Sequence, residues 1–166
     1  TDLVATHTDN GLRIKSATTR GGTIEDIYFR ICTLDSVKFV FNYTLNWNPS
    51  YSYSELPKGY TYQALPAHWK SMLEKVIPAE KGIPHAKDVY VSNVTATHVQ
   101  NVFSVTGLVQ SLLTNFNYSN SRISADATGP MEYAKGWKFD NVVIDIQKIK
   151  PSSKPQPKEV EERLKQ

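Results

Sequence analysis

The chain has 166 residues, enough for one domain with a sizeable core, and 40% of them are hydrophobic. Its mean hydropathy is −0.41, and no apolar run approaches the roughly 18 residues of a membrane span, so we expect no membrane partner. A single cysteine, Cys32, excludes an intrachain disulfide and a cysteine-based metal site. The chain opens on Thr1 without a signal peptide, and we expect it to be trimmed or excised from something longer.

The formal net charge of +3 is concentrated at one end of the chain. From Lys148 onward there are six basic and three acidic residues, so residues 1–147 carry 13 of each and are neutral. Nucleic-acid binding normally needs a basic face or stripe, and we expect no nucleic-acid partner. The segment 148–166 has the Pro- and Ser-rich composition of a basic linker, and no function is assigned to it.

The hexapeptide 10–15 (NGLRIK) is the most informative stretch. In a strand, successive side chains point to opposite faces, so Leu12 and Ile14 share one face while Arg13 and Lys15 share the other, about 7 Å apart. Two fixed cations suit a carboxylate-bearing ligand, because the Arg fork binds bidentately and the Lys acts as a point charge. The alternative is a solvated strand face with two ordinary surface cations.

Four segments resemble one another, each a short strand, a bend and another short strand: 26–33, 88–95, 115–122 and 136–143. The later three begin 27 and 21 residues apart, a spacing typical of a solenoid coil. Asn recurs at the bend, as Asn93, Asn120 and Asn141, and Asn tolerates the left-handed conformation. In the first copy Ile31 replaces it, and we expect that bend to turn differently.

A second apolar stretch follows each bend, at 37–41, 102–106 and around 131–133. These runs are short, β-branched and aromatic, without a sustained helical period, and they predict an all-β, right-handed parallel β-helix over residues 1–147, incomplete at its N-terminal end. An antiparallel sandwich is the alternative, but the hairpin dipeptide Asn-Gly occurs only at residues 10–11.

An insertion at about 46–86 separates the first two copies, with a short helix predicted at 67–76. Loops this long are usually functional or disordered, and the aromatic content argues against disorder. Its aromatic residues either form a sugar-stacking wall or pack the loop onto the coils. The residues considered for sugar stacking are Trp47, Tyr51 and Tyr53.

Four motifs of this chain together resemble the C-terminal part of glycoside hydrolase family 28. They are Thr8 to Lys15, then Arg20-Gly21-Gly22, the segment that begins at Asp26, and Tyr43. This family contains polygalacturonases and rhamnogalacturonan hydrolases, which fold as right-handed parallel β-helices. The specific motifs cover about residues 5–45. By this resemblance Arg13 and Lys15 contact the carboxylate and hydroxyls of the sugar at the cleavage site, and Tyr43 lies beside them.

Glycosidic hydrolysis needs a carboxylic acid to protonate the leaving oxygen and a carboxylate to activate water. The resemblance places these residues upstream of the motif, where this chain has only Asp2 and Asp9, so we predict no catalytic residue in this segment and no activity on its own. The histidines show no metal-ligand spacing, and we expect neither a metal nor a cofactor: His7, His68, His85 and His98.

The resemblance implies a pectin-degrading, inverting glycoside hydrolase, secreted or periplasmic when whole. Its partner would be a galacturonate-containing plant cell-wall polysaccharide. The alternative is a non-catalytic β-helical module that binds acidic polysaccharide. We also predict that the open end of the β-helix is capped or pairs with a second copy, because unpaired strand edges promote association.

Overall fold

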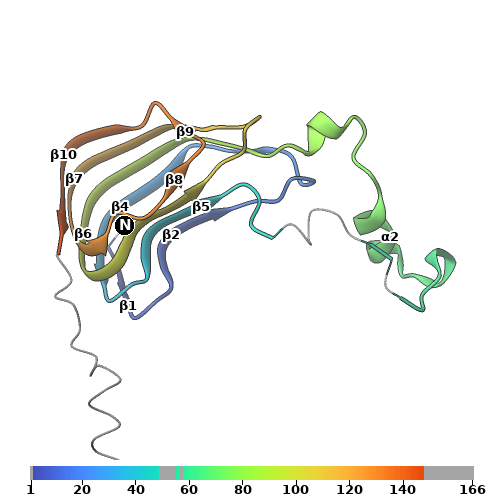
Figure 1. Ribbon diagram of the computed structural model, residues 1–166, viewed down its shortest axis with the longest axis horizontal. Coiled ribbons are helices and arrows are strands. Elements are labelled where there is room, and N and C mark those ends of the chain that lie inside the picture. The colour runs from blue at the N-terminus through green and yellow to red at the C-terminus, as the bar shows by residue number, and fades with distance from the viewer. Residues whose placement is uncertain (1, 49–54, 57, 148–166) are drawn as a thin grey trace, which may run out of the picture.

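The structure is a computed structural model that describes residues 2–48, 55, 56 and 58–147. Most of its regular elements are strands (Figure 1). The strands are β1 Leu3–Thr6, β2 Asn10–Lys15, β3 Thr23–Ile24, β4 Ile27–Asp35, β5 Phe39–Thr44, β6 His85–Thr106, β7 Leu113–Ala127, β8 Met131–Glu132, β9 Ala134–Lys135 and β10 Lys138–Ile146. The helices are η1 Tyr62–Ala64, α2 Ala67–Leu73 and η2 Ala79–Gly82.

All of these strands pair in parallel, which confirms the predicted fold class and rules out the antiparallel sandwich. They curl into a half-barrel, consistent with an incomplete parallel β-helix (Figure 1). Within the described residues, β1 pairs only with β4 and β2 only with β5, so each has an unpaired edge. Whether a cap or a second copy covers these edges stays a prediction.

The four predicted repeats stack in register. Ile27 pairs with Val89, and Val89 with Phe116, while Lys138 pairs with Asn117 in the last coil. Each repeat has a residue with a positive φ at its start: Asp26 directly before β4, Asp88 within β6, Asn115 within β7 and Gly136 two residues before β10. Local sequence similarity therefore predicted long-range register correctly.

The bends form a second column of left-handed residues. Asn93, Asn120 and Asn141 have φ values of 54°, 47° and 51° and are exposed, and Asn141 Nδ2 donates to Asn120 Oδ1 at 2.8 Å. Ile31, at φ 55°, turns in the same way, so the expectation of a different bend was wrong. Its flanking residues are held in register with β6, which imposes a conformation that a β-branched residue disfavours.

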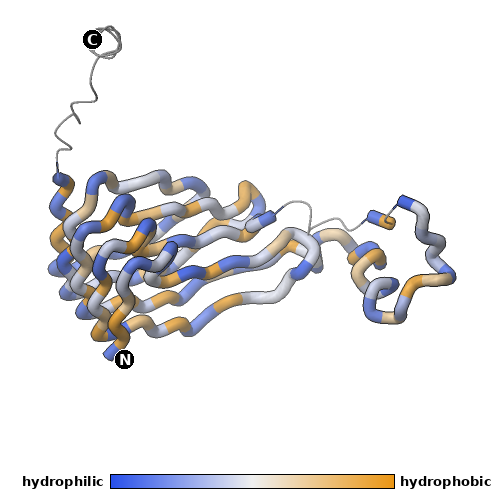
Figure 2. Tube along the Cα trace, turned by 90° about the horizontal axis from the view of Figure 1, so that it is seen from below, coloured by the Kyte–Doolittle hydropathy of each residue, from blue (hydrophilic) through white to orange (hydrophobic). Residues whose placement is uncertain are grey.

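The interior of the half-barrel is packed with aliphatic and aromatic side chains. Along the strands hydrophobic residues alternate with polar ones, which Figure 2 shows as alternating colours of the chain trace. The aromatic part of the interior is a continuous cluster in which the Phe116 and Trp137 rings stack at 4.6 Å and Trp137 Nε1 donates to the Leu113 carbonyl at 3.0 Å. Cys32 is buried here, as expected of a core thiol. Because one face of each strand packs into this core, the opposite face is exposed on the outside of the half-barrel.

The insertion leaves the stacked coils and carries the three helices of the described residues (Figure 1). The predicted helix is present but ends at Leu73. Two backbone hydrogen bonds connect the C-terminal end of the insertion to residues 21 and 22. Gly21 N–H donates to the Gly82 carbonyl, and His85 N–H donates to the Gly22 carbonyl. None of the helices in the described part of the chain is long and apolar enough to cross a membrane. The predicted linker at 148–166 lies outside the described residues.

Candidate functional site: a cationic strand face

Arg13 and Lys15 are exposed on β2, with Ile14 between them only 6% exposed. The strand alternation predicted from the sequence is therefore correct, and both cations stand on the outer side of the half-barrel. We call this surface, formed by Arg13, Lys15 and the neighbouring Trp47, the cationic face.

Trp47 follows β5 and lies over the two cations. Lys15 Nζ is 3.9 Å from the centre of its ring, and Arg13 Cζ is 5.7 Å away. The Trp47 backbone N–H donates to the Ser16 carbonyl at 2.9 Å, which fixes the ring next to the end of β2. The ring is 42% exposed, and it attracts the two cations through its negative face. Its role as a sugar-stacking residue stays a prediction, while its contact with Lys15 is a feature that the sequence did not reveal.

The cationic face continues across the neighbouring coils as two rows of outward side chains. The row through Arg13 continues with Asn42 and Ser104, and the row through Lys15 with Thr44, Thr106 and Glu132. Asn42 Nδ2 donates to Asn10 Oδ1 at 2.7 Å, which holds its amide beside the cations. Sequence reasoning missed Asn42, although it immediately precedes Tyr43 and so must face the opposite side of β5.

Tyr43 lies inside the half-barrel. Its side chain is 0% exposed, and the Tyr118 hydroxyl donates to the Tyr43 hydroxyl at 3.3 Å. Burial raises the pKa of both hydroxyls well above the usual range. The resemblance predicts that Tyr43 lies beside Arg13 and Lys15 as a substrate-binding residue; in the structure it pairs in register with Ile14, between them in sequence, and faces the interior as Ile14 does. A direct contact between its side chain and a ligand at the cationic face does not fit this burial.

The other aromatic candidates belong to the insertion. Tyr51 and Tyr53 lie outside the described residues. Further along, Tyr60, Tyr62 and Trp69 are all exposed, and the Tyr60 and Trp69 ring centres are 6.0 Å apart. The helical segment that carries them, which includes α2, lies away from the stacked strands (Figure 1).

Acidic groups are sparse on the cationic face. Within the described residues, the rows through Arg13 and Lys15 contain one carboxylate, Glu132, three strands from Lys15, or about 14 Å at typical strand spacing. Two carboxylates about 5 to 9.5 Å apart are required to cleave a glycosidic bond. No group of three or more His, Cys, Asp or Glu side chains in the described part of the chain could hold a metal ion. The arrangement on this face can bind and orient an anion.

A comparison with curated proteins matches this chain to a probable polygalacturonase of Vitis vinifera. The two are 32% identical over 102 residues, which cover 57% of this chain and 20% of that protein. The chain thus spans about a fifth of the length of this relative. No protein-family model matches the chain, and no solved structure does. The chain is therefore similar, at low identity and over part of its length, to a polygalacturonase.

Proposed function

We propose that this chain is part of a pectin-degrading glycoside hydrolase of family 28, in which the cationic face binds a uronate of the polysaccharide. The observation that supports this proposal most directly is the pair Arg13 and Lys15. Both are exposed on one strand face, and both lie within cation–π distance of Trp47. The partial similarity to a probable polygalacturonase supports the same substrate class.

In this proposal each cation has a distinct role. Arg13 presents a planar fork that pairs with both oxygens of a carboxylate, and Lys15 supplies a compact charge with three donors for the second oxygen or a ring hydroxyl. Trp47 keeps the Lys15 ammonium in place, which lowers the conformational entropy lost when the ligand binds. Asn42 adds a neutral amide beside Arg13 for a sugar hydroxyl.

Hydrolysis would need the acid and the base from coils outside this chain, and the reaction would invert the anomeric centre, as the family resemblance implies. The chain's own contribution is to hold the substrate at the cleavage position. The complete enzyme would act on galacturonate-containing cell-wall polysaccharide in a secreted or periplasmic setting.

One observation favours a second candidate, a non-catalytic module that binds acidic polysaccharide. The described rows of the cationic face hold a single carboxylate, which is enough for neither catalytic arrangement. The two candidates share the ligand and differ in whether a longer protein that includes the neighbouring coils cleaves it.

The test is a calorimetric titration of the chain with trigalacturonate, with a reducing-sugar assay in parallel. Arg13→Gln and Lys15→Gln should each weaken binding about tenfold or more, since a hydrogen bond to a charged group contributes about 1.5–3 kcal/mol. Lys135→Gln, on β9, removes the same charge elsewhere and should leave binding unchanged. Binding that is indifferent to both Arg13→Gln and Lys15→Gln overturns the proposal, and hydrolysis by this chain alone would show that its carboxylates have been misassigned.

A further inference from the structure

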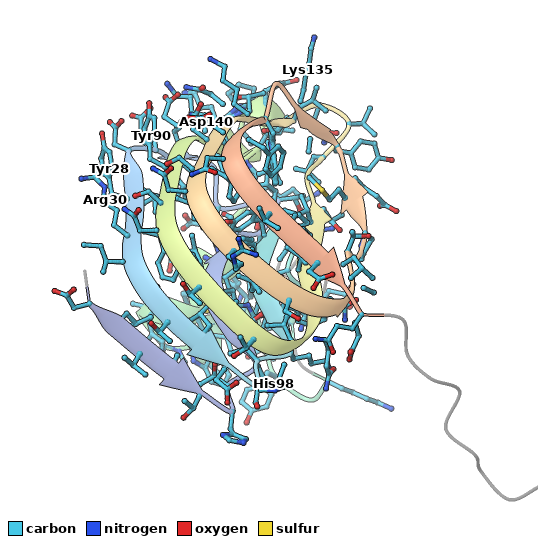
Figure 3. All side chains as sticks on the ribbon, turned by 90° about the vertical axis from the view of Figure 1, so that its left-hand side faces the viewer. Tyr28, Arg30, Tyr90, His98, Lys135 and Asp140 are labelled. Carbon is cyan, nitrogen blue, oxygen red and sulfur yellow. The ribbon has the colours of Figure 1, made fainter. Side chains whose placement is uncertain are left out.

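A second outward surface lies on β4, β6 and β7. It carries the aromatic and cationic residues Tyr28, Arg30 and Tyr90, which Figure 3 shows gathered at one side of the stacked strands. Along β6, the two left-handed residues Asn93 and His98 separate this surface from the strand portion that pairs with β5. We call it the tyrosine face, and it points in a different direction from the cationic face.

The tyrosine face is built by register. Tyr28 and Tyr90 pair across β4 and β6, and their rings stack with centres 5.0 Å apart and planes within 13°. Arg30 Cζ lies 4.5 Å from the centre of the Tyr28 ring, which is 55% exposed. The stack stabilises the two coils, and it also holds a guanidinium in a defined place at the surface.

A shallow depression of about 460 Å³ lies beside this stack. Its polar lining comes from three adjacent strands: Arg30, Tyr90, Ser92, Asn93, Asn117 and Ser119. Asn117 Nδ2 donates to the backbone and side-chain oxygens of Asn115, which holds the Asn117 amide in place. Hydroxyls and amides that accept and donate hydrogen bonds around one aromatic edge are the groups that bind saccharides in concave sites.

The charge of this depression is positive. Arg30 takes part in none of the ion pairs among the described residues. The row through Arg30 continues with Ser92 and Ser119, and its first acid is Asp140 on β10, about 14 Å away at typical strand spacing. A guanidinium with neutral neighbours prefers a ligand that brings its own carboxylate.

We propose that this depression is a second binding site for a carboxylate-bearing saccharide, remote from the cationic face. Arg30 pairs with the carboxylate, while the hydroxyls of Tyr90, Ser92 and Ser119 bind the sugar. The ligand class rests on the proposed function, and the site itself rests on the geometry of the tyrosine face. Two such sites on different faces would let the protein hold a polysaccharide at a point away from the one being processed.

The test is an amide chemical-shift titration of the uniformly ¹⁵N-labelled chain with trigalacturonate. We expect two separate groups of perturbed amides, one around residues 13–16 and 42–44, the other around 28–30, 90–93 and 117–119. Arg30→Gln should weaken the second group's apparent affinity about fivefold or more and leave the first unchanged. Arg122→Gln, an exposed arginine on β7 beyond the Asn120 bend, is the matched control and should change neither.

The outcomes separate the two proposals. Perturbation of the first group alone overturns the second site and keeps the proposed function, while perturbation of the second group alone overturns the role of the cationic face and supports the tyrosine face. No perturbation in either group overturns both. A neutral saccharide, the fully methyl-esterified trimer, should perturb the second group much less, and equal shifts would contradict the role of Arg30.

Discussion

Aromatic residues occur on both sides of the coils of this protein, with opposite consequences. Inside, Tyr43, Phe116 and Trp137 pack against one another, with Tyr43 and Phe116 fully buried and Trp137 partly buried. Outside, Trp47 and Tyr28 are about half exposed, and each lies against a cation. Residue type is the same in the two regions, so it cannot by itself identify a ligand-binding aromatic.

Whether an aromatic residue lies inside or outside depends on which face of its strand it occupies. Tyr43 faces the interior, whereas its neighbours Asn42 and Thr44 face outward beside Arg13 and Lys15. Successive residues of a strand alternate between faces, so a shift of one position exchanges core and surface. A motif match that names the correct strand can therefore still name a residue on its wrong face.

The largest expected difference between the two regions is in stability. Phe116→Ala should lower the free energy of unfolding by about 3–5 kcal/mol, because it leaves a cavity where a fully buried ring was. Tyr90→Ala, which removes one ring of the outer stack, should cost about 0.5–1.5 kcal/mol. Urea unfolding measures both, and equal losses would contradict the division into interior and exterior aromatics.

Tyr43→Phe sharpens the comparison at a residue that the resemblance assigns to the ligand and that the structure buries. The change removes the acceptor of the buried Tyr118 hydroxyl, so we expect a loss of about 1–3 kcal/mol in stability and no change in trigalacturonate affinity. Because burial raises the pKa of Tyr43 and Tyr118 in the folded state, wild-type stability should hold below about pH 10 and fall as the pH rises above it. Weaker trigalacturonate binding with unchanged stability would instead indicate that Tyr43 contacts the ligand.

Trp47→Leu tests the exterior aromatic in the same way. It removes the ring over Lys15 and Arg13 at a position that is 42% exposed, so stability should change little. A cation–π contact at such a site is worth about 0.5–1 kcal/mol, which predicts trigalacturonate binding about two- to fivefold weaker by calorimetry. Affinity equal to that of the wild type would show that Trp47 does not organise the cations.

The smallest expected effect comes from a polar cluster that belongs to neither aromatic region. Asp35 Oδ1 is 2.7 Å from His98 Nδ1 and accepts from Thr97 Oγ1, and these hydrogen bonds, that from His98 first, hold the pKa of Asp35 below its ordinary value. The ionised Asp35 carboxylate therefore stabilises the fold above about pH 4, and this stabilisation is lost as the pH falls through the lowered pKa. Asp35→Asn should lower the thermal midpoint slightly at about pH 6 and not at about pH 2, and an equal decrease at both would exclude the carboxylate charge as the cause.

The sequence by itself determined the repeated strand–bend–strand unit, the register of its four copies and the outward side of Arg13 and Lys15. These follow from local alternation and from bends at residues that tolerate a left-handed conformation. The insertion and its short helix could also be predicted, because a run without repeat similarity interrupts two matching copies.

Only the tertiary structure decided which face of β5 is buried, that Ile31 bends as the asparagines do, and which cations Trp47 and Tyr28 contact. Each of these depends on contacts between coils. The pattern of a single strand shows that its side chains alternate between two faces, but not which face is buried. That is decided when neighbouring coils stack around a common core. The depression of the tyrosine face has the same origin, since its polar lining comes from successive coils, on β4, β6 and β7, whose side chains meet only when the coils stack.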